Sequence, residues 1–407
     1  MRQENRTSFT AVDNLNLQKL IPLYLGAIIG PMGGIGIITL IPVMADEWSI
    51  EFATASLAIT FYMIPFVMVQ LFSGSIAQLF DVRKTLLFGF IIYALGAFLC
   101  GISGNLAGFL GSRVVQGMGA AFFFPIIMAL IGELVPPEHV GKAIGTLGMA
   151  YTIGVTIGPF ISGAIDVRYG WPWFFFLLAG LSLLSGLLYW ISSASTGKVD
   201  RESPTILAAF GILKKSLLQP GVLYLSFSAF SFFVAYIGIM TFTADYLRTY
   251  FQLPSDQIGA LLSVTGISGV IVSPIAGFAG DYLGRIRVFL GSAALSLVCV
   301  ALMGFIGFSY WVHFTLFLLF GTGAASSWTT LNTMAVQACP SFRKPVTSVY
   351  NAVKFAGYAA SPVILSPLYS LFQIRAVRWG CMAAILIAAM LAFMAGEPSE
   401  EGGDDVL

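Results

Sequence analysis

The stretch 109–163 reads FLGSRVVQGMGAAFFFPIIMALIGELVPPEHVGKAIGTLGMAYTIGVTIGPFISG. It consists of two long apolar runs joined by the polar link 135–142, and the first run carries one arginine, Arg113, among apolar and small residues. A charge inside hydrocarbon costs about 2.5–3.5 kcal/mol on insertion scales, so it is rarely found without a partner or a water-filled cavity. The second run is studded with small residues, which let helix backbones approach closely in lipid. Its glycines include Gly145, Gly154, Gly158 and Gly163. The stretch predicts two spanning helices of a membrane protein with a polar interior.

The composition of the whole chain agrees with a membrane protein. It is 57% hydrophobic and 10% charged, where soluble domains are about 25% charged. The net charge of +1 argues against a polyanion-binding protein, and no nucleic-acid motif, hydrolase triad, metal cluster or phosphate-cradling loop is present. The four cysteines lie in apolar runs without CxxC spacing, a pattern that indicates buried free thiols. The sequence therefore predicts neither an enzyme nor a cofactor, and no nucleic-acid partner.

Twelve segments reach the length of about 20 mostly apolar residues that a membrane span needs. They are residues 20–43, 54–78, 85–103, 106–134, 142–165, 171–192, 219–244, 257–280, 286–308, 311–336, 346–370 and 378–395. The predicted organisation is a cytoplasmic N-terminal segment (1–19), a six-helix bundle (20–192), a cytoplasmic linker that can lie on the membrane surface (193–218), a second six-helix bundle (219–395) and an acidic tail (396–407).

The Lys and Arg residues of the loops predict the orientation, because cytoplasmic loops carry the excess of positive charge. With both termini inside, fourteen Lys and Arg residues fall in inner segments and four in outer ones. The four outer residues are Arg168, Arg248, Arg375 and Arg378. We therefore expect a multi-pass protein of the cell membrane with both termini in the cytoplasm.

The two halves of the chain repeat. Gly277 follows Gly74 at an offset of 203 residues, and Pro362 follows Pro159 at the same offset. The run Gly321-x-Gly323-Ala324-Ala325 repeats Gly117-x-Gly119-Ala120-Ala121 at an offset of 204. Parallel repeats of this kind place the binding site of a transporter between the halves, near the bilayer midplane.

Two motifs of the opening stretch carry a resemblance to a known family. Arg113-x-x-Gln116-Gly117-x-Gly119-Ala120-Ala121 resembles the fourth-helix motif of the major facilitator superfamily. Gly145-x8-Gly154-x3-Gly158-Pro159-x2-Ser162-Gly163 resembles the fifth-helix motif of its twelve-span drug:proton antiporters, with Ser162 where that motif usually has glycine. The resemblance implies an all-α polytopic protein of the major facilitator fold, with twelve transmembrane helices in two pseudo-symmetric six-helix bundles. It also implies a monomer that moves a small-molecule substrate and protons across the lipid bilayer.

A loop motif of the same superfamily is similar to the linker after the eighth span. Gly277, Asp281, Gly284 and Arg285 match its G-x-x-x-D-x-x-G-R pattern. The resemblance implies a latch in which Asp281 faces the N-terminus of another helix. We expect this partner to be the start of the eleventh span. In the alternative interpretation, these residues only define a tight loop. The N-terminal copy keeps Gly74 and Arg83 but has Gln78 at the acid position. On a continuing helix Asp81 shares the face of Gln78, and we expect it to replace the missing acid.

Two cations lie inside spans. Lys354 is about nine residues into the eleventh span, roughly 13 Å deep at 1.5 Å per residue, and an ionisable residue at that depth is a functional candidate. It either binds an anionic group or serves as an internal counter-charge. Arg113 either snorkels from the outer end of the fourth span or is a buried cation beside Gln116 that tunes a proton carrier or contacts substrate.

No acid lies within the first span, where the resemblance implies a carboxylate for proton coupling. The remaining proton-coupling candidates lie near span ends. They are Asp46, Glu133, Asp245 and His313. Each has a simpler interpretation as an interfacial residue, and for Asp245 this is a surface ion pair with Arg248, one turn further on.

The candidate substrate cavity combines aromatic rings and methionine with a few polar groups, a mixture that suits varied amphipathic ligands. We expect its lining to include Tyr24, Met32, Tyr62, Met63, Arg113, Gln116, Tyr236, Met240, Trp328, Asn332, Tyr350, Asn351, Lys354 and Tyr358. Any one of them can instead face lipid or pack between helices.

Three functions fit these features. The first is proton-coupled efflux of amphipathic, drug-like compounds by alternating access, which the fifth-helix motif favours. The second is transport of an anionic metabolite or lipid-like solute with Lys354 and Arg113 as counter-charges, which the absent core carboxylate favours. The third, remote alternative is a non-transporting membrane receptor on this fold.

Overall fold

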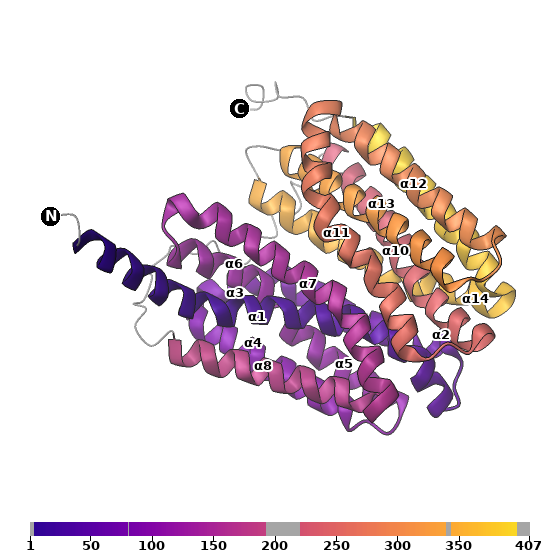
Figure 1. Cartoon of the computed structure of the whole chain (residues 1–407), viewed down its shortest axis with the longest axis horizontal. Coiled ribbons are helices and arrows are strands. Elements are labelled where there is room, and N and C mark those ends of the chain that lie inside the picture. The colour runs from indigo at the N-terminus through magenta and orange to yellow at the C-terminus, as the bar shows by residue number, and fades with distance from the viewer. Residues whose placement is uncertain (1–3, 80, 193–219, 339–342, 397–407) are drawn as a thin grey trace.

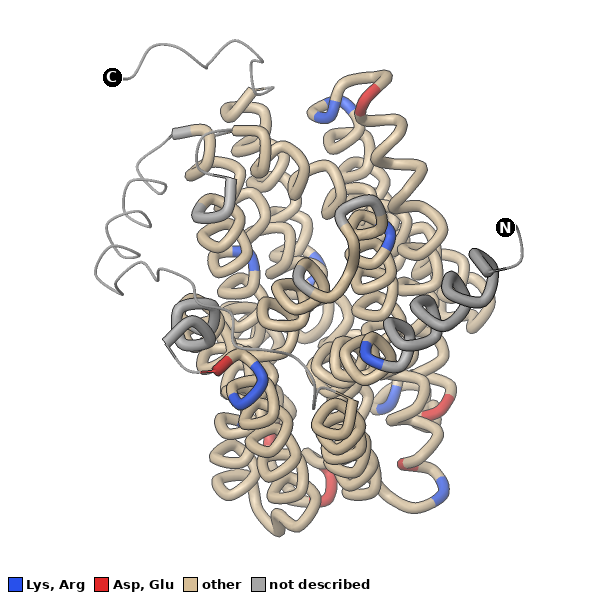
Figure 2. The backbone as a smooth tube through the Cα atoms, turned by 90° about the vertical axis from the view of Figure 1, so that its left-hand side faces the viewer, with Lys and Arg blue, Asp and Glu red and all other residues tan. Residues whose placement is uncertain are grey.

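The structure is a computed structural model that describes residues 4–79, 81–192, 220–338 and 343–396. The predicted linker 193–218 and the tail beyond residue 396 lie outside this range. The described chain is helical, and its helices form two bundles that lie side by side, one from the N-terminal half and one from the C-terminal half (Figure 1). Charged residues are sparse along the body of the bundles, as expected for a surface that faces lipid (Figure 2).

The N-terminal bundle consists of α1 (Glu4–Glu47), α2 (Phe52–Ala55), α3 (Leu57–Leu79), α4 (Val82–Gly101), α5 (Leu106–Ala120), α6 (Phe123–Leu134), α7 (Pro137–Tyr169) and α8 (Pro172–Ser192). The C-terminal bundle consists of α10 (Pro220–Phe251), α11 (Ser255–Leu283), α12 (Arg285–Phe305), α13 (Tyr310–Gln337) and α14 (Arg343–Ala395). The first helix begins at Glu4, well before the predicted start at Leu20.

The helices account for the twelve predicted spans. Within the described residues, ten helical segments are long and apolar enough to cross a membrane. The 28-residue helix α13, which is not among these ten, covers the span predicted at 311–336 and is long enough to cross. Helix α14 adds another, because its 53 residues are interrupted at Gln373, where φ is 59° and ψ is −165°. This break falls between the two spans predicted at 346–370 and 378–395.

The predicted fourth span is divided into α5 and α6. The division follows from Pro125, which lies at the start of α6. Proline has no backbone N–H, and its ring crowds the carbonyl group four residues earlier. That carbonyl belongs to Ala121, the C-cap residue of α5. The span therefore still crosses the bundle, but with a local bend below its Gly117-x-Gly119 motif.

The repeat in the sequence corresponds to a repeat in packing. A Cβ atom on Gly117 would collide with the backbone of Tyr62 in α3, and one on Gly321 would collide with the backbone of Thr265 in α11. Tyr62 and Thr265 are 203 positions apart in the sequence. The next glycines of the two motifs repeat this relation, with Gly119 against Tyr93 and Gly323 against Ser296. The equivalent helices of both bundles are therefore held by the same glycine contacts.

The middle of α1 is the centre of the N-terminal bundle. Within 29–36, five backbone carbonyl groups accept hydrogen bonds from side chains of five other helices. The donors are Tyr93 to Ile29 (2.9 Å), Tyr62 to Gly30 (3.0 Å), Arg113 to Gly33 (3.3 Å), Tyr358 to Gly34 (3.0 Å) and Ser162 to Gly36 (2.7 Å). Glycines supply four of these carbonyls, because a helix without side chains there lets donors reach its backbone. Tyr358 belongs to α14, so one bond joins the two bundles.

The glycine contacts generate a prediction within α5. Replacing Gly117 by Ala should lower the midpoint of thermal unfolding in detergent, because the new methyl group meets the carbonyl oxygen of Tyr62 and overpacking costs about 1–3 kcal/mol. Gly111 lies in the same helix with open space around it, so Gly111→Ala is the matched control and should leave the midpoint unchanged or raise it. Equal midpoints for the two variants would contradict this account.

Candidate transport cavity

A cavity of about 430 Å³ lies between the bundles. Helices α3, α6 and α7 of the N-terminal bundle and α10, α11, α13 and α14 of the C-terminal bundle contribute to its wall. The lining is mostly aromatic and small, with polar groups at Gln70, Ser273, Asn332 and Thr347 toward one end. These four residues lie near the ends of their helices that the charge count predicts to be cytoplasmic. We refer to this side as the inner end and to the opposite side as the outer end.

Lys354 is the only charged side chain that lines this cavity in the described part of the chain. It is 3% exposed. Its Nζ donates to Oδ1 of Asn351 at 2.7 Å and to Oδ1 of Asn332 at 3.5 Å. Among the described residues it has no carboxylate partner closer than 4.0 Å. The ammonium group is thus held by neutral amide oxygens, which leaves its charge uncompensated.

Aromatic rings surround the same ammonium group. Nζ lies 4.7 Å from the ring centroid of Phe355 and 4.8 Å from that of Trp328, with Tyr350 at 5.4 Å and Phe233 at 5.8 Å. The negative faces of such rings attract a cation, by about 2 kcal/mol or more where water is excluded. The rings lower the cost of burying the charge without neutralising it, and they present flat apolar surface beside it.

The structure brings together part of the predicted cavity lining. Six of the predicted residues line the main cavity, namely Tyr236, Trp328, Asn332, Tyr350, Asn351 and Lys354. Tyr62, Met63 and Tyr358 line a smaller cavity next to it. The two cavities therefore bring together nine of the fourteen predicted residues, from α3, α10, α13 and α14. That these residues contact a substrate stays a prediction.

Five predicted lining residues lie outside both cavities: Tyr24, Met32, Arg113, Gln116 and Met240. The hydroxyl group of Tyr24 donates to the carbonyl of Ala143 at 3.2 Å, and the others are buried in helix contacts. Residue type alone had suggested them, and the direction in which each side chain points depends on the rotation of its helix.

Arg113 is fully buried inside the N-terminal bundle and does not snorkel. It donates to Oε1 of Gln116 at 2.6 Å and to the backbone carbonyls of Gly33 (3.3 Å) and Ala58 (3.2 Å). Its guanidinium carbon lies 4.1 Å from the ring centroid of Tyr62. The cation thereby ties α1, α3 and α5 together, and the Tyr62 ring that it contacts lines the smaller cavity.

The main cavity also has lining residues that the sequence analysis did not single out. Tyr151 and Thr152 of α7 and Phe66 of α3 face it from the N-terminal bundle. Tyr151 precedes Lys354 by 203 residues, so the two are equivalent positions of the repeat. That offset was the signal available in the sequence for finding Tyr151.

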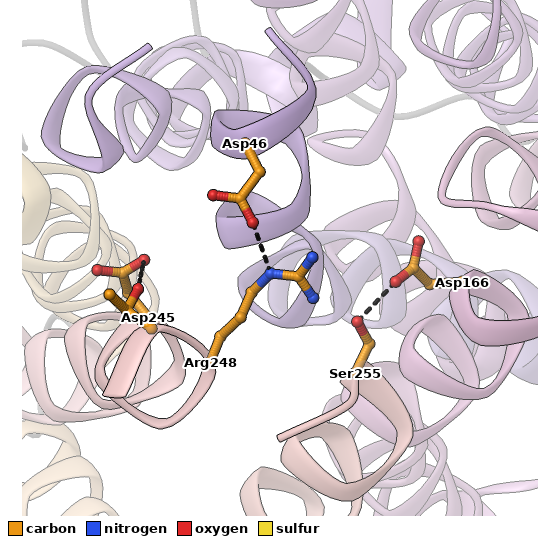
Figure 3. Close-up of polar contacts among 6 residues, drawn as sticks. Asp46, Asp166, Asp245, Arg248 and Ser255 are labelled. Atoms are coloured by element: carbon orange, nitrogen blue, oxygen red, sulfur yellow. Dashed lines mark hydrogen bonds and ion pairs between the residues drawn. The ribbon is translucent and has the colours of Figure 1, made fainter. Parts of the chain in front are cut away.

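The two bundles are joined at the outer end. Arg248 of α10 donates through Nε to Asp46 of α1 at 2.8 Å, and Ser255 of α11 donates to Asp166 of α7 at 2.6 Å (Figure 3). Closer to the middle, Thr60 donates to the carbonyl of Ala359 at 2.7 Å. The hydrogen bonds between bundles in the described residues all lie at this end or at mid-level. The structure is closed at the outer end, with the cavity on the inner side of the closure.

The glycine motif of the predicted fifth helix contributes to the closure. Gly154 and Gly158 of α7 lie against the backbone of α1, whereas Gly163 lies against the backbone of Ser255 in the other bundle. Gly145 has open space around it. Helix α7 therefore packs on its own bundle along one part of the motif and on the opposite bundle further along.

The expected ion pair between Asp245 and Arg248 is wrong. Arg248 pairs with Asp46 instead (Figure 3). The carboxylate of Asp245 is buried and accepts hydrogen bonds from the hydroxyl groups of Tyr369 and Thr249. One helical turn separates Asp245 from Arg248, but their side chains point toward different helices. Arg248 therefore pairs with Asp46 of the other bundle.

Of the two remaining proton-coupling candidates, the structure describes only the side chain of His313, and it does not line the main cavity with Lys354. His313 is buried at the start of α13, where its ring nitrogen Nδ1 lies 3.2 Å from the carbonyl oxygen of Ser309. The side chain of Glu133 lies outside the part of the chain that the structure describes. In the described range, the main cavity has no carboxylate in its lining.

The loop motif of the C-terminal half forms a local pair. Arg285 donates to Oδ1 of Asp281 at 2.6 Å, and both residues lie at the junction of α11 and α12. Gly284 between them has φ of 89°, a conformation that favours glycine. The side chains at the start of α14, where we expected a latch partner, lie outside the described residues, as does the packing around Gly74.

The expectation that Asp81 replaces the missing acid of the N-terminal motif is wrong. Helix α3 ends at Leu79, so Asp81 does not continue the face of Gln78. Instead it is the N-cap of α4 and accepts from the backbone N–H groups of Arg83 (2.9 Å) and Lys84 (3.2 Å). Free N–H groups at a helix start attract a nearby carboxylate more strongly than a distant helix does. Arg83 itself donates to the carbonyl of Trp190 at 2.6 Å.

Two pseudo-symmetric helical bundles around a central cavity, joined to each other at the outer end, are the architecture of alternating-access secondary transporters. The profile of the Major Facilitator Superfamily matches residues 23–250 and 225–405. The chain therefore belongs to the major facilitator superfamily. It is a multi-pass membrane transporter and not an enzyme.

Similarity to individual proteins extends over most of the chain. It is 23% identical over 371 residues to the uncharacterized transporter YwfA of Bacillus subtilis, covering 88% of this chain and 86% of that protein. It is 24% identical over 373 residues to the bacillibactin exporter of Bacillus subtilis, with 87% and 90% coverage. Its fold is similar to that of a bacterial homologue of the human lysosomal transporter Spinster, solved in an inward-facing, unoccupied conformation, with a TM-score of 0.77, 16% identity, and 94% and 97% coverage.

The outer closure generates a prediction. Replacing Arg248 by Gln removes the ion pair with Asp46, which is partly exposed and worth about 0.2–1 kcal/mol. The ratio of outer-open to outer-closed molecules should rise, by no more than about fivefold. Spin-label distances across the outer end would measure it. The matched control is Arg168→Gln, an exposed arginine on α7 at the same end.

The charge-swapped double variant Asp46→Arg with Arg248→Asp should restore the original ratio. An unchanged distance distribution in Arg248→Gln would show that the ion pair does not hold this end closed.

Proposed function

We propose that this chain exports amphipathic organic anions by alternating access, in exchange for protons. The observation that carries the proposal is Lys354, whose ammonium group is the only charge lining the main cavity in the described residues and has no acidic partner there. This combines the amphipathic substrate of the first hypothesis with the anionic group of the second.

The electrostatics favour an anion over a cation. A charge in a low-dielectric wall interacts strongly with a ligand charge, by about 4 kcal/mol at 4 Å with an effective dielectric constant of 20. A substrate carboxylate or other acid near Nζ would gain this attraction and add a charge-assisted hydrogen bond to those from Asn332 and Asn351. A cationic drug in the same place would meet repulsion of similar size.

The rest of the cavity favours an amphipathic partner for that acid. Phe233, Trp328 and Phe355 border the ammonium group. Phe66 and Tyr151 line the same cavity from the other bundle. Cavities of a few hundred Å³ lined in this way bind drug-sized molecules through apolar burial and orient them through a few polar groups.

Export and proton exchange are supported by similarity rather than by the cavity. The fifth-helix motif resembles that of drug:proton antiporters, and one relative matched over most of its length is named as an exporter. Asp245 is one of the carboxylates predicted to couple protons. It is buried, and its hydrogen-bond partners are hydroxyl groups and not a cation. It lies behind the outer closure, where it can exchange protons with the outside when that end opens.

The main test of the proposal is Lys354→Gln in proteoliposomes. Transport of an arylcarboxylate should fall at least tenfold, because a hydrogen bond from a charged group contributes about 1.5–3 kcal/mol. The neutral amide analogue of the same compound should be transported at a similar low rate by both proteins. Lys142→Gln, an exposed lysine near the inner end, is the control and should leave the rate unchanged.

Full arylcarboxylate transport in Lys354→Gln would overturn the anion proposal. So would equal transport of the carboxylate and of a matched cationic amine by the unmodified protein.

A second test concerns proton exchange. Replacing Asp245 by Asn should abolish accumulation of the arylcarboxylate driven by an imposed pH gradient, while exchange of labelled for unlabelled substrate without a gradient continues. Glu51→Gln, an exposed acid at the same end, should keep both activities. Gradient-driven accumulation that survives in Asp245→Asn would remove Asp245 as the coupling residue.

A further inference from the structure

A second, smaller cavity of about 50 Å³ adjoins the main one. We call it the side compartment. Residues that line it but not the main cavity include Gly30, Gly34, Tyr62, Met63, Ala120 and Tyr358. They come from α1, α3 and α5 of the N-terminal bundle and from α14 of the other. The side compartment therefore lies between the bundles, as the main cavity does.

The two cavities share an aromatic wall. Trp328, Phe233 and Phe355 line both. The same three rings surround Nζ of Lys354 at centroid distances of 4.7–5.8 Å. A ligand whose acidic group sits at Lys354 would therefore have its next atoms against rings that border the side compartment.

The side compartment lies deeper than Lys354. Helix α14 runs from the inner end outward, and Tyr358 follows Lys354 by one helical turn, or about 6 Å. Beyond Tyr358, the two bundles are joined by the hydrogen bond of Thr60 to Ala359. The compartment is thus the blind, outer-facing extension of a cavity whose wider part faces the inner end.

The walls of the side compartment present mainly apolar surface to a ligand. No charged side chain lines it among the described residues. Three of its four tyrosine hydroxyl groups are already used: Tyr62 donates to the carbonyl of Gly30 and Tyr358 to the carbonyl of Gly34, both at 3.0 Å, and Tyr236 pairs with Thr265 at 3.2 Å. The fourth tyrosine, Tyr151, also lines the main cavity. Gly30 and Gly34 add no side chain to this wall, where a Cβ atom would already come within 3.3–3.4 Å of the rings of Phe123 and Tyr62. Such a space accepts a hydrocarbon group and offers a polar group few free partners.

The geometry points to a two-part substrate: an acid that binds Lys354 and a compact hydrocarbon end that enters the side compartment. This inference rests on the proposed function, since it places the acidic group at Lys354, and it adds the class of the substrate's other end. The hydrocarbon end leads toward the outer closure and the acidic group trails toward the inner end. Substrate selectivity by length is then determined by Met63 and Ala120, which line the compartment and not the main cavity.

The test uses a series of straight-chain carboxylates of increasing length, which compete with a labelled arylcarboxylate in proteoliposomes. In the unmodified protein, apparent affinity should rise about fourfold per added methylene group until the compartment is full, and then level off. In Ala120→Leu, the apparent affinity should level off at a chain about three carbon atoms shorter, because the substitution adds about three non-hydrogen atoms to the compartment. Met63→Ala removes about three non-hydrogen atoms, so the apparent affinity should level off at a longer chain.

The two variants shift the plateau in opposite directions, so a general loss of folding cannot imitate the result. Partitioning into lipid is the same for every variant, and only differences between variants are compared. Opposite shifts, with the thermal midpoint retained, support the side compartment as the binding site of the hydrocarbon end. An identical length profile in all three proteins, or a loss that is uniform over all lengths in both variants, overturns it.

The matched amide series separates this inference from the proposed function. If carboxylates are preferred over amides but the length profile does not respond to either variant, the side compartment is not the site and the anion proposal stands. If amides and carboxylates compete equally in the unmodified protein, the anion proposal fails, and the two-part assignment fails with it.

Discussion

The structure depends on close approach of helix backbones at glycine. Lipid tails are as apolar as leucine, so the hydrophobic effect does not press one spanning helix against another, and packing between small residues must do so. Gly117 and Gly321 let α5 and α13 lie directly on the backbones of α3 and α11. Gly163 and Gly259 do the same between α7 and α11, across the bundle interface. The fold of each bundle and the closure of the outer end are thus products of one kind of contact.

The same constraint makes α1 the meeting point of the structure. A glycine-rich helix exposes its backbone carbonyls, and side chains from α3, α4, α5, α7 and α14 donate to five of them. The bond from Tyr358 to Gly34 crosses between the bundles next to the side compartment. A change in how the bundles meet must alter this bond, so the shape of the cavity and the arrangement of the bundles are linked through α1.

The two buried cations illustrate how surroundings determine what a charge does. Arg113 is enclosed by backbone carbonyls, an amide and one ring, all within its own bundle, and it holds three helices in register. Lys354 has two amide oxygens and four rings around it, and it faces an open cavity. The first charge is enclosed by its own bundle, with Nε and Nη1 hydrogen-bonded and Nη2 without a hydrogen-bond partner among the described residues. The second faces a cavity and retains capacity for a ligand.

The amino-acid sequence by itself determined the helical membrane fold, the duplication and the depth of Lys354, because these follow from local hydropathy and from residue spacing. It also placed Tyr236, Trp328 and Asn351 in the cavity. It could not place Met32 or Met240, which have suitable chemistry but face neighbouring helices. Only the tertiary structure decided that Arg248 meets Asp46 rather than Asp245, and that Asp81 caps α4. The physical reason is that a side chain's partner depends on the rotation and end point of its helix, and both are set by contacts with residues far away in the chain.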